Sequence, residues 1–252
     1  MNIQFGSGVL FAVPTAGNLA TNPTPYKLGV LQEAQVAIKG DLKKLYGQKQ
    51  FPVAKARGKI DVSVKAKLAA LDPNMINQLF FAQTAAVGMT QIADDEAQAV
   101  PGTPYTVTVT NATTFVRDYG VRLASNGNQL TRVTTGPATG QYSVTESGAN
   151  KGKYVFAAAD TLLNMLISYA YTQTTTGTTI TLSNQLMGFA PEFCAFLYNT
   201  FRTKFFGLEL YNCTASEIGI PTKQEDFWVV DINFDACTDA TDTLGKLYAD
   251  NF

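Results

Sequence analysis

The chain has 252 residues, of which 46% are apolar and only 15% are charged, and its formal net charge is −1. An average globular domain has about 25% charged residues, so the composition excludes a disordered chain and predicts a surface that other protein covers. The absence of histidine removes the commonest general base and the usual zinc and iron ligand. The near-neutral charge also argues against a dedicated nucleic-acid binder.

Cysteine usage and the N-terminal segment bear on the compartment in which the chain folds. Cys194, Cys213 and Cys237 form no CxxC motif, so neither a zinc ribbon nor a disulfide framework is predicted. The Cys194 and Cys213 thiols are expected to be buried and structural, because no histidine could activate them. Because the first basic residue is Lys27, the N-terminal segment lacks the positively charged region of a signal peptide. No run approaches the roughly 18 apolar residues of a membrane helix. We expect a soluble cytosolic product without cofactor or enzymatic activity.

In chain order, the first distinctive segment is residues 40–58, GDLKKLYGQKQFPVAKARG, which we interpret as a long basic loop between two strands. Loops of this length are uncommon in compact domains unless they have a function. Docking onto another protein subunit accounts for its large apolar residues better than nucleic-acid binding by interleaved lysines and aromatics does. The candidate contact residues are Leu42, Lys43, Lys44, Tyr46, Phe51, Lys55 and Arg57.

Residues 60–68 (IDVSVKAKL) alternate apolar and polar side chains, which is typical of a half-buried strand. Asp72 as N-cap and Pro73 at the first helical position then predict a helix over residues 73–85. We expect its apolar stripe to pack on a sheet, although such a stripe would also suit a partner or cofactor groove. The stripe consists of Met75, Ile76, Leu79 and Phe80.

Residues 97–176 differ from the rest of the chain in their frequent turn residues and are predicted to form a β-rich inserted domain. Turn clusters separate short strands there, which indicates a small β-sandwich or a set of long hairpins. The strands are expected at residues 105–110, 115–123, 129–133, 141–144, 153–157 and 165–172. The main β domain would then be discontinuous, formed by residues 1–96, with an N-terminal arm at 1–27, and by residues 177–252.

Further strands are predicted at residues 179–186, 193–198 and 228–237. The last of these is apolar on one face and places Asp231, Asn233 and Asp235 on the other. Charge is unevenly distributed: residues 39–67 contain nine basic and two acidic residues, whereas eight acidic and two basic residues follow from Glu217 onward. Either each run is a solvated face, or the basic segment of one copy contacts the acidic segment of another.

Several blocks of the sequence resemble the major tail tube proteins of long-tailed bacteriophages of the siphovirus and myovirus type. The blocks are LGVLQEAQVAIKGDLKKLYGQKQFPVAKARGKIDVSVKAKLAALDPNMINQLFF at 28–81, YSVTESGANKGKYVFAAAD, LISYAYT, ITLSNQLMGFAPEF and IPTKQEDFWVVDINFDACTD. They make up 114 of the 252 residues, and their specificity comes from their order. The resemblance implies a mainly β fold, a tail-tube-like β-sandwich or barrel with one short flanking α-helix and the β-rich insertion on the tube exterior.

The same resemblance implies a structural subunit that forms stacked hexameric rings around a channel for DNA. Residues 40–58 would be the stacking loop, and Asp231, Asn233 and Asp235 would be candidates for lining the lumen. Expected partners are further copies of the chain, the tape measure protein, the tail terminator, and baseplate or tip proteins, with DNA passing transiently. The product would lie in the virion tail after assembly in the host bacterial cytoplasm. The alternative is a surface-displayed Ig-like, adhesin or pilin-like β module.

Overall fold

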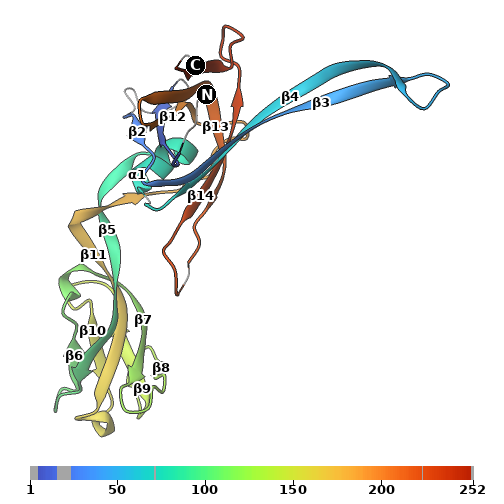
Figure 1. Ribbon diagram of the computed structural model, residues 1–252. Helices are drawn as coiled ribbons and strands as arrows, with labels where there is room; N and C mark the ends of the chain where they lie inside the picture. Colours follow the sequence, from blue (N-terminus) through green and yellow to red (C-terminus); the bar gives the residue numbers. More distant parts are fainter. Residues whose placement is uncertain (1–4, 16–23, 71, 223, 251–252) are drawn as a thin grey trace. The chain divides into compact units, whose positions relative to one another are not determined.

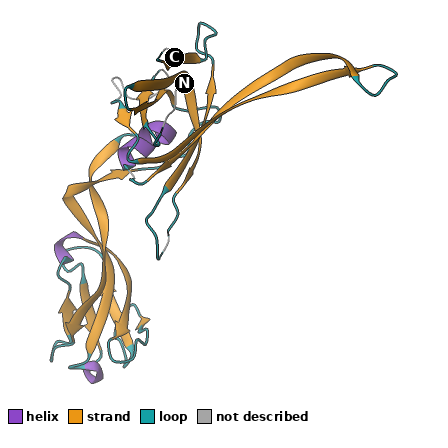
Figure 2. Cartoon of the chain, viewed as in Figure 1, coloured by secondary structure: helices purple, strands orange, loops and turns teal. Residues whose placement is uncertain are grey.

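The computed structural model describes residues 5–15, 24–70, 72–222 and 224–250 and is mainly β-structure (Figures 1 and 2). The chain divides into two compact units. Unit 1 contains the described residues up to Thr84 and from Ile180 onward, and unit 2 is Ala85–Thr179. Two segments that are distant in the sequence thus fold together in unit 1.

Unit 1 is built on an eight-stranded sheet with the spatial order β2-β1-β12-β13-β14-β4-β3, in which β15 pairs with β13. The pairings given for this sheet are antiparallel, and β14 from the C-terminal segment lies against β4 from the N-terminal segment. The strands are β1 (Val9–Pro14), β2 (Tyr26–Lys27), β3 (Leu31–Tyr46), β4 (Pro52–Leu68), β12 (Glu192–Phe201), β13 (Lys204–Gly219), β14 (Val230–Cys237) and β15 (Gly245–Ala249).

The core of unit 1 lies on one face of this sheet. Period-two alternation produces it, because every second side chain of β4 and β14 points to the same side. At its centre the ring of Phe193 meets Phe234 edge-on, with centroids 5.3 Å apart. The predicted strand at residues 60–68 is confirmed as part of β4, although Ile60 itself is half exposed. The buried side chains of these two strands are Val62, Val64, Ala66, Leu68, Val230, Ile232 and Phe234.

A short helix covers this core (Figure 2). Helix α1 (Pro73–Ile76) begins where the Asp72 carboxylate accepts a 2.9 Å hydrogen bond from the backbone N–H of Asn74, and it continues as the π-helical turn η1 (Asn77–Phe81). Met75 and Leu79 of the predicted stripe are buried in the core. The predicted end at residue 85 is wrong, because Ala82 adopts a left-handed conformation with φ of 48° and stops the helix.

The predicted loop at residues 40–58 is also wrong as secondary structure. Strands β3 and β4 continue through most of it, and only residues 47–51 form the connecting turn (Figure 1). The hydrophobic pattern could not reveal these strands because both of their faces are exposed, so neither face selects apolar residues.

The strand predicted at residues 179–186 is wrong as well, since β11 (Asn164–Ile180) ends where that prediction begins. The residues that follow are held by side-chain hydrogen bonds to the end of η1. Gln185 Nε2 donates to the carbonyl oxygen of Phe81 at 2.8 Å, and Ser183 Oγ lies 2.9 Å from Gln83 Oε1. These side-chain hydrogen bonds hold the segment in place of the backbone hydrogen bonds that a strand would form with its neighbour.

Unit 2 contains two further sheets, with the orders β6-β10-β9-β8 and β5-β11-β7. Its bounds differ from the expected 97 and 176 because β5 and β11 run through both positions as continuous strands. Strand β7 has the bounds expected from the sequence. The elements are β5 (Ala85–Ala99), β6 (Thr106–Thr108), η2 (Ala112–Thr114), β7 (Phe115–Leu123), β8 (Thr131–Arg132), β9 (Gln141–Thr145), β10 (Lys153–Phe156), η3 (Ala158–Asp160) and β11.

The core of unit 2 is separate from that of unit 1 and rich in aromatic residues. It includes Phe115, Tyr154 and Tyr169, with the Phe115 and Tyr169 rings stacked at 5.7 Å. The side chain of Asp118 is only 3% exposed and accepts hydrogen bonds from Tyr142 Oη at 2.7 Å and Tyr154 Oη at 2.9 Å. These hydroxyls stabilise a carboxylate that would otherwise be costly to bury.

Candidate functional site

The main candidate for an interaction surface is the outer part of the β3–β4 hairpin, residues 41–59, here called the hairpin arm (Figure 1). Strand β14 pairs with β4 only as far as the Ala236–Val62 pair, so beyond it β4 has β3 alone as a partner. An isolated two-stranded hairpin is at best marginally stable in water. Contact with a surface that covers the arm would therefore stabilise it.

The positions of the charges on the hairpin arm also favour contact with a partner. Lys44 lies directly opposite Lys55 in the antiparallel ladder, and Leu42 lies opposite Arg57 on the same face. Like charges directly opposite one another destabilise a pair of strands. A partner that supplies carboxylates would remove this repulsion, which a free arm has to tolerate.

The arm also exposes large apolar side chains near its tip. Phe51 is 82% exposed and Val53 is 74% exposed. Clustered apolar groups on a surface indicate a site of protein contact. Every contact residue predicted from the sequence lies exposed on the arm, and the structure brings them together on one hairpin; these are Leu42, Lys43, Lys44, Tyr46, Phe51, Lys55 and Arg57.

A bulge lies at the base of the arm. Gly40 pairs with Ile60 and Leu42 pairs with Arg57, so the register shifts between the two pairs. Bulges bend and twist a ribbon. The direction of the arm is therefore set at Gly40, where β3 leaves the body of the sheet.

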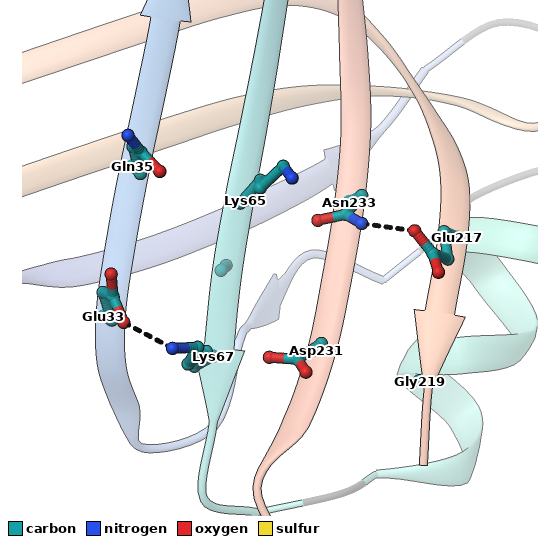
Figure 3. A pocket seen from close by; sticks show the side chains of 9 residues that line it. Glu33, Gln35, Lys65, Lys67, Glu217, Gly219, Asp231 and Asn233 are labelled. Carbon is teal, nitrogen blue, oxygen red and sulfur yellow. Dashed lines mark hydrogen bonds and ion pairs between the residues drawn. The ribbon is translucent and has the colours of Figure 1, made fainter. Parts of the chain in front are cut away.

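The second candidate surface is the face of the sheet opposite the helix-covered core, where Asp231 and Asn233 lie beside Lys65 and Lys67 of β4 (Figure 3). Lys67 Nζ forms a 2.7 Å ion pair with Glu33, and this hydrogen bond raises the pKa of Lys67. These side chains and their neighbours border a cavity of about 320 Å³. The face expected to be acidic is thus mixed in charge.

The third predicted residue of this set, Asp235, is exposed and lies opposite Ser63. Asp231, Asn233 and Asp235 therefore point away from the core, as alternation with Val230, Ile232 and Phe234 requires. Their role in lining a lumen stays a prediction. The sequence alone does not show that β4 is the neighbouring strand, which places Lys65 and Lys67 beside these residues.

An apolar groove lies where β14 ends and the hairpin arm leaves the sheet. Its volume is about 720 Å³. Two carboxylates, Asp61 and Asp235, lie on it together with apolar groups and an exposed thiol. The remaining lining residues are Ile60, Val62, Ala236, Cys237, Thr238 and Leu244. No motif signals this groove in the sequence, because strand order alone brings its residues together.

The three cysteines differ in environment, and all are free thiols. Cys213 is fully buried, and burial raises its pKa to about 12. Cys194 is half-buried, and burial together with nearby Glu209 raises its pKa. Cys237 is exposed. The predicted burial of Cys213 is confirmed, whereas the predicted burial of Cys194 is wrong, because this thiol is only half-buried.

In the parts of the chain that the structure describes, no cluster of three or more cysteines, aspartates or glutamates could hold a metal ion. None of the helices formed by these residues is both long enough and apolar enough to cross a membrane.

The comparisons with known proteins add no family to this description. The chain matches no protein-family model. A comparison with curated proteins likewise gives no match.

Proposed function

We propose that the chain is the structural subunit of a bacteriophage tail tube, a non-enzymatic protein that forms stacked hexameric rings around a channel for DNA. The observation that carries the proposal is the hairpin arm, an exposed, basic and apolar ribbon with Lys44 opposite Lys55. Such an element favours assembly because contact with a neighbouring ring would cover its apolar groups and neutralise its charge.

The edges of the unit 1 sheet support ring formation. Strand β3 is an edge strand of 16 residues, and β2 lies at the other edge of the sheet. Long exposed edges invite pairing with another chain, whereas closure of several sheets into one barrel removes them. In this proposal the helix-covered face points outward and the mixed-charge face of Figure 3 lines the lumen.

The mixed-charge face suits a channel that DNA must traverse. Lys67 is paired with Glu33, and Asp231 lies on its other side in the neighbouring strand. The carboxylates of Glu33, Glu217 and Asp231 outnumber Lys65 and Lys67 on this face, so it would attract phosphates little and DNA would slide over it with little adhesion. Lysines without neighbouring carboxylates would bind the phosphates and retain the DNA.

Negative-stain electron microscopy of the purified chain at low and high salt tests the proposal. Hollow tubes or stacked rings with a central channel are the expected result. Tape measure and tip proteins would be co-expressed to nucleate tubes if the chain alone stays monomeric. Absence of rings and tubes in both preparations would contradict the proposal.

The alternative function is a surface-displayed β module of the Ig-like, adhesin or pilin-like kind. Unit 2 favours it, because this unit has its own two sheets and its own aromatic core. This alternative predicts a persistent monomer on which the hairpin arm of unit 1 has no function. Loss of assembly on substitution of the arm would decide against it.

A further inference from the structure

We propose that the groove at the base of the hairpin arm is the receptor for the tip of the arm of a second copy. The inference rests on the proposed function in one point, that the occupant is another copy of this chain. It adds the surface on the receiving subunit and the residues that meet.

Charge and polarity of the groove complement those of the tip. The groove has two carboxylates, Asp61 and Asp235, beside apolar Ile60 and Leu244. The tip has the exposed aromatic ring of Phe51, with lysines on both strands that lead to it. An apolar group that enters the groove while lysines meet its carboxylates would satisfy both partners.

The size of the groove fits this occupant. About 720 Å³ lies within the range of roughly 300–1,000 Å³ that binding pockets have, and it exceeds one aromatic side chain. Phe51 and a neighbouring side chain of the tip would fill it. Lys39 of β3 lies opposite Asp61 and carries the opposite charge, whereas Asp235 lies opposite the neutral Ser63. Asp235 is therefore the carboxylate of the groove that has no cation opposite it on β4.

The tip cannot reach the groove of its own chain. Strand β4 runs without interruption between Val53 and Ile60, and a strand rises about 3.3 Å per residue, so more than 20 Å of paired ribbon separates the two. Binding therefore joins two different surfaces of two copies. Contacts of this head-to-tail type build open stacks or closed rings and do not stop at a dimer.

Cys237 gives a direct readout because it is exposed and lies in the groove. In a Gln50→Cys variant, which keeps the Phe51 ring, a short bismaleimide should link residue 50 of one copy to Cys237 of another. The matched control is Gln224→Cys, which replaces another exposed glutamine of unit 1. We expect at least ten-fold more linked product from Gln50→Cys than from the control, and none when Cys237→Ser is added.

A second measurement needs no variant in the tip. Alkylation of Cys237 in the wild-type assembly should be at least ten-fold slower than in the monomer. Tubes in which Cys237 reacts at the monomer rate, and in which residue 50 does not link to it, would overturn the inference and leave the proposed function standing. Specific linking without rings or tubes would support the inference and contradict the proposed function. If neither the linked product nor rings and tubes are found, the inference and the proposed function are both contradicted.

Discussion

The hydroxyl of Tyr154 donates a 2.9 Å hydrogen bond to the carboxylate of Asp118. Both groups lie in the core of unit 2, where an unpaired carboxylate would be costly. Tyr154→Phe keeps the ring and removes this donor, so it should destabilise unit 2 by about 1–3 kcal/mol. Hydrogen exchange of the β9 and β10 amides measures the change, with unit 1 amides as an internal reference.

The matched control for that variant is Tyr119→Phe, because Tyr119 lies on strand β7 with Asp118 but is 53% exposed. Its amide exchange should stay close to that of the wild type. Equal destabilisation by both variants would show that the buried hydrogen bond is not the cause.

Alkaline pH should weaken unit 2. Burial and the adjacent Asp118 carboxylate raise the pKa of Tyr142 and of Tyr154 above the ordinary value of 10.0. The folded state therefore favours the neutral phenols, and this stabilisation is complete below pH 10 and is lost as the pH rises above it. Urea unfolding monitored at increasing pH should show this fall, and Tyr154→Phe should reduce its slope. A pH-independent unfolding midpoint up to pH 11 would argue against the effect.

Reversing one charge of the hairpin arm should separate stability from assembly. Lys44→Glu would place a carboxylate opposite Lys55, and an opposite-charge pair of this kind stabilises a ladder by roughly 0.2–1 kcal/mol. Exchange of arm amides in the monomer should therefore slow or stay constant, while tube growth is lost. Electron microscopy and hydrogen exchange on one preparation measure both.

The double variant Lys43→Glu with Lys44→Glu should likewise leave folded protein that forms no tubes. Its charge-matched control is Lys151→Glu with Lys153→Glu in unit 2, which should assemble normally. Normal tubes from the arm variant would remove the charge part of the hypothesis, and failure of both double variants would point to net charge alone.

The thiols should react in order of their exposure. At pH 8, iodoacetamide should modify Cys237 first, because this thiol is exposed. Cys213 should resist, since at a pKa of about 12 only about one thiol in ten thousand is ionised and the group is buried. Mass spectrometry of labelled peptides gives the order. Labelling of Cys213 at the rate of Cys237 in folded protein would contradict its burial.

The sequence predicted those elements in which one face is buried. Residues 60–68 and 230–237 alternate because the core selects apolar side chains at every second position of β4 and β14. The strand predicted from residue 228 begins only at Val230, and Trp228, which the pattern placed on the apolar face, is exposed. In the hairpin arm both faces are exposed, so its sequence lacks the alternation of apolar and polar residues that indicates a strand. The composition of the arm predicts a contact surface, which stays a prediction, whereas the loop predicted for the same residues is wrong.

The groove and the mixed-charge face could not be predicted in the same way. Both depend on β14 lying beside β4, a pairing between residues such as Asp231 and Lys67 that are far apart in the sequence. A single strand shows its own alternation but not the charges of its neighbour. The acidic row at Asp231 was therefore visible in the sequence, and the lysines that interrupt it were not.

The two strands by which the chain enters and leaves unit 2, β5 and β11, are hydrogen-bonded neighbours. Near their ends Thr179 Oγ1 donates a 2.7 Å hydrogen bond to the carbonyl oxygen of Gly88. Adjacent strands lie about 4.8 Å apart, a gap that a two-residue turn closes. A different domain, or a simple turn, could therefore replace the part of unit 2 that lies beyond the paired ends of β5 and β11, and the connectivity of unit 1 would stay the same.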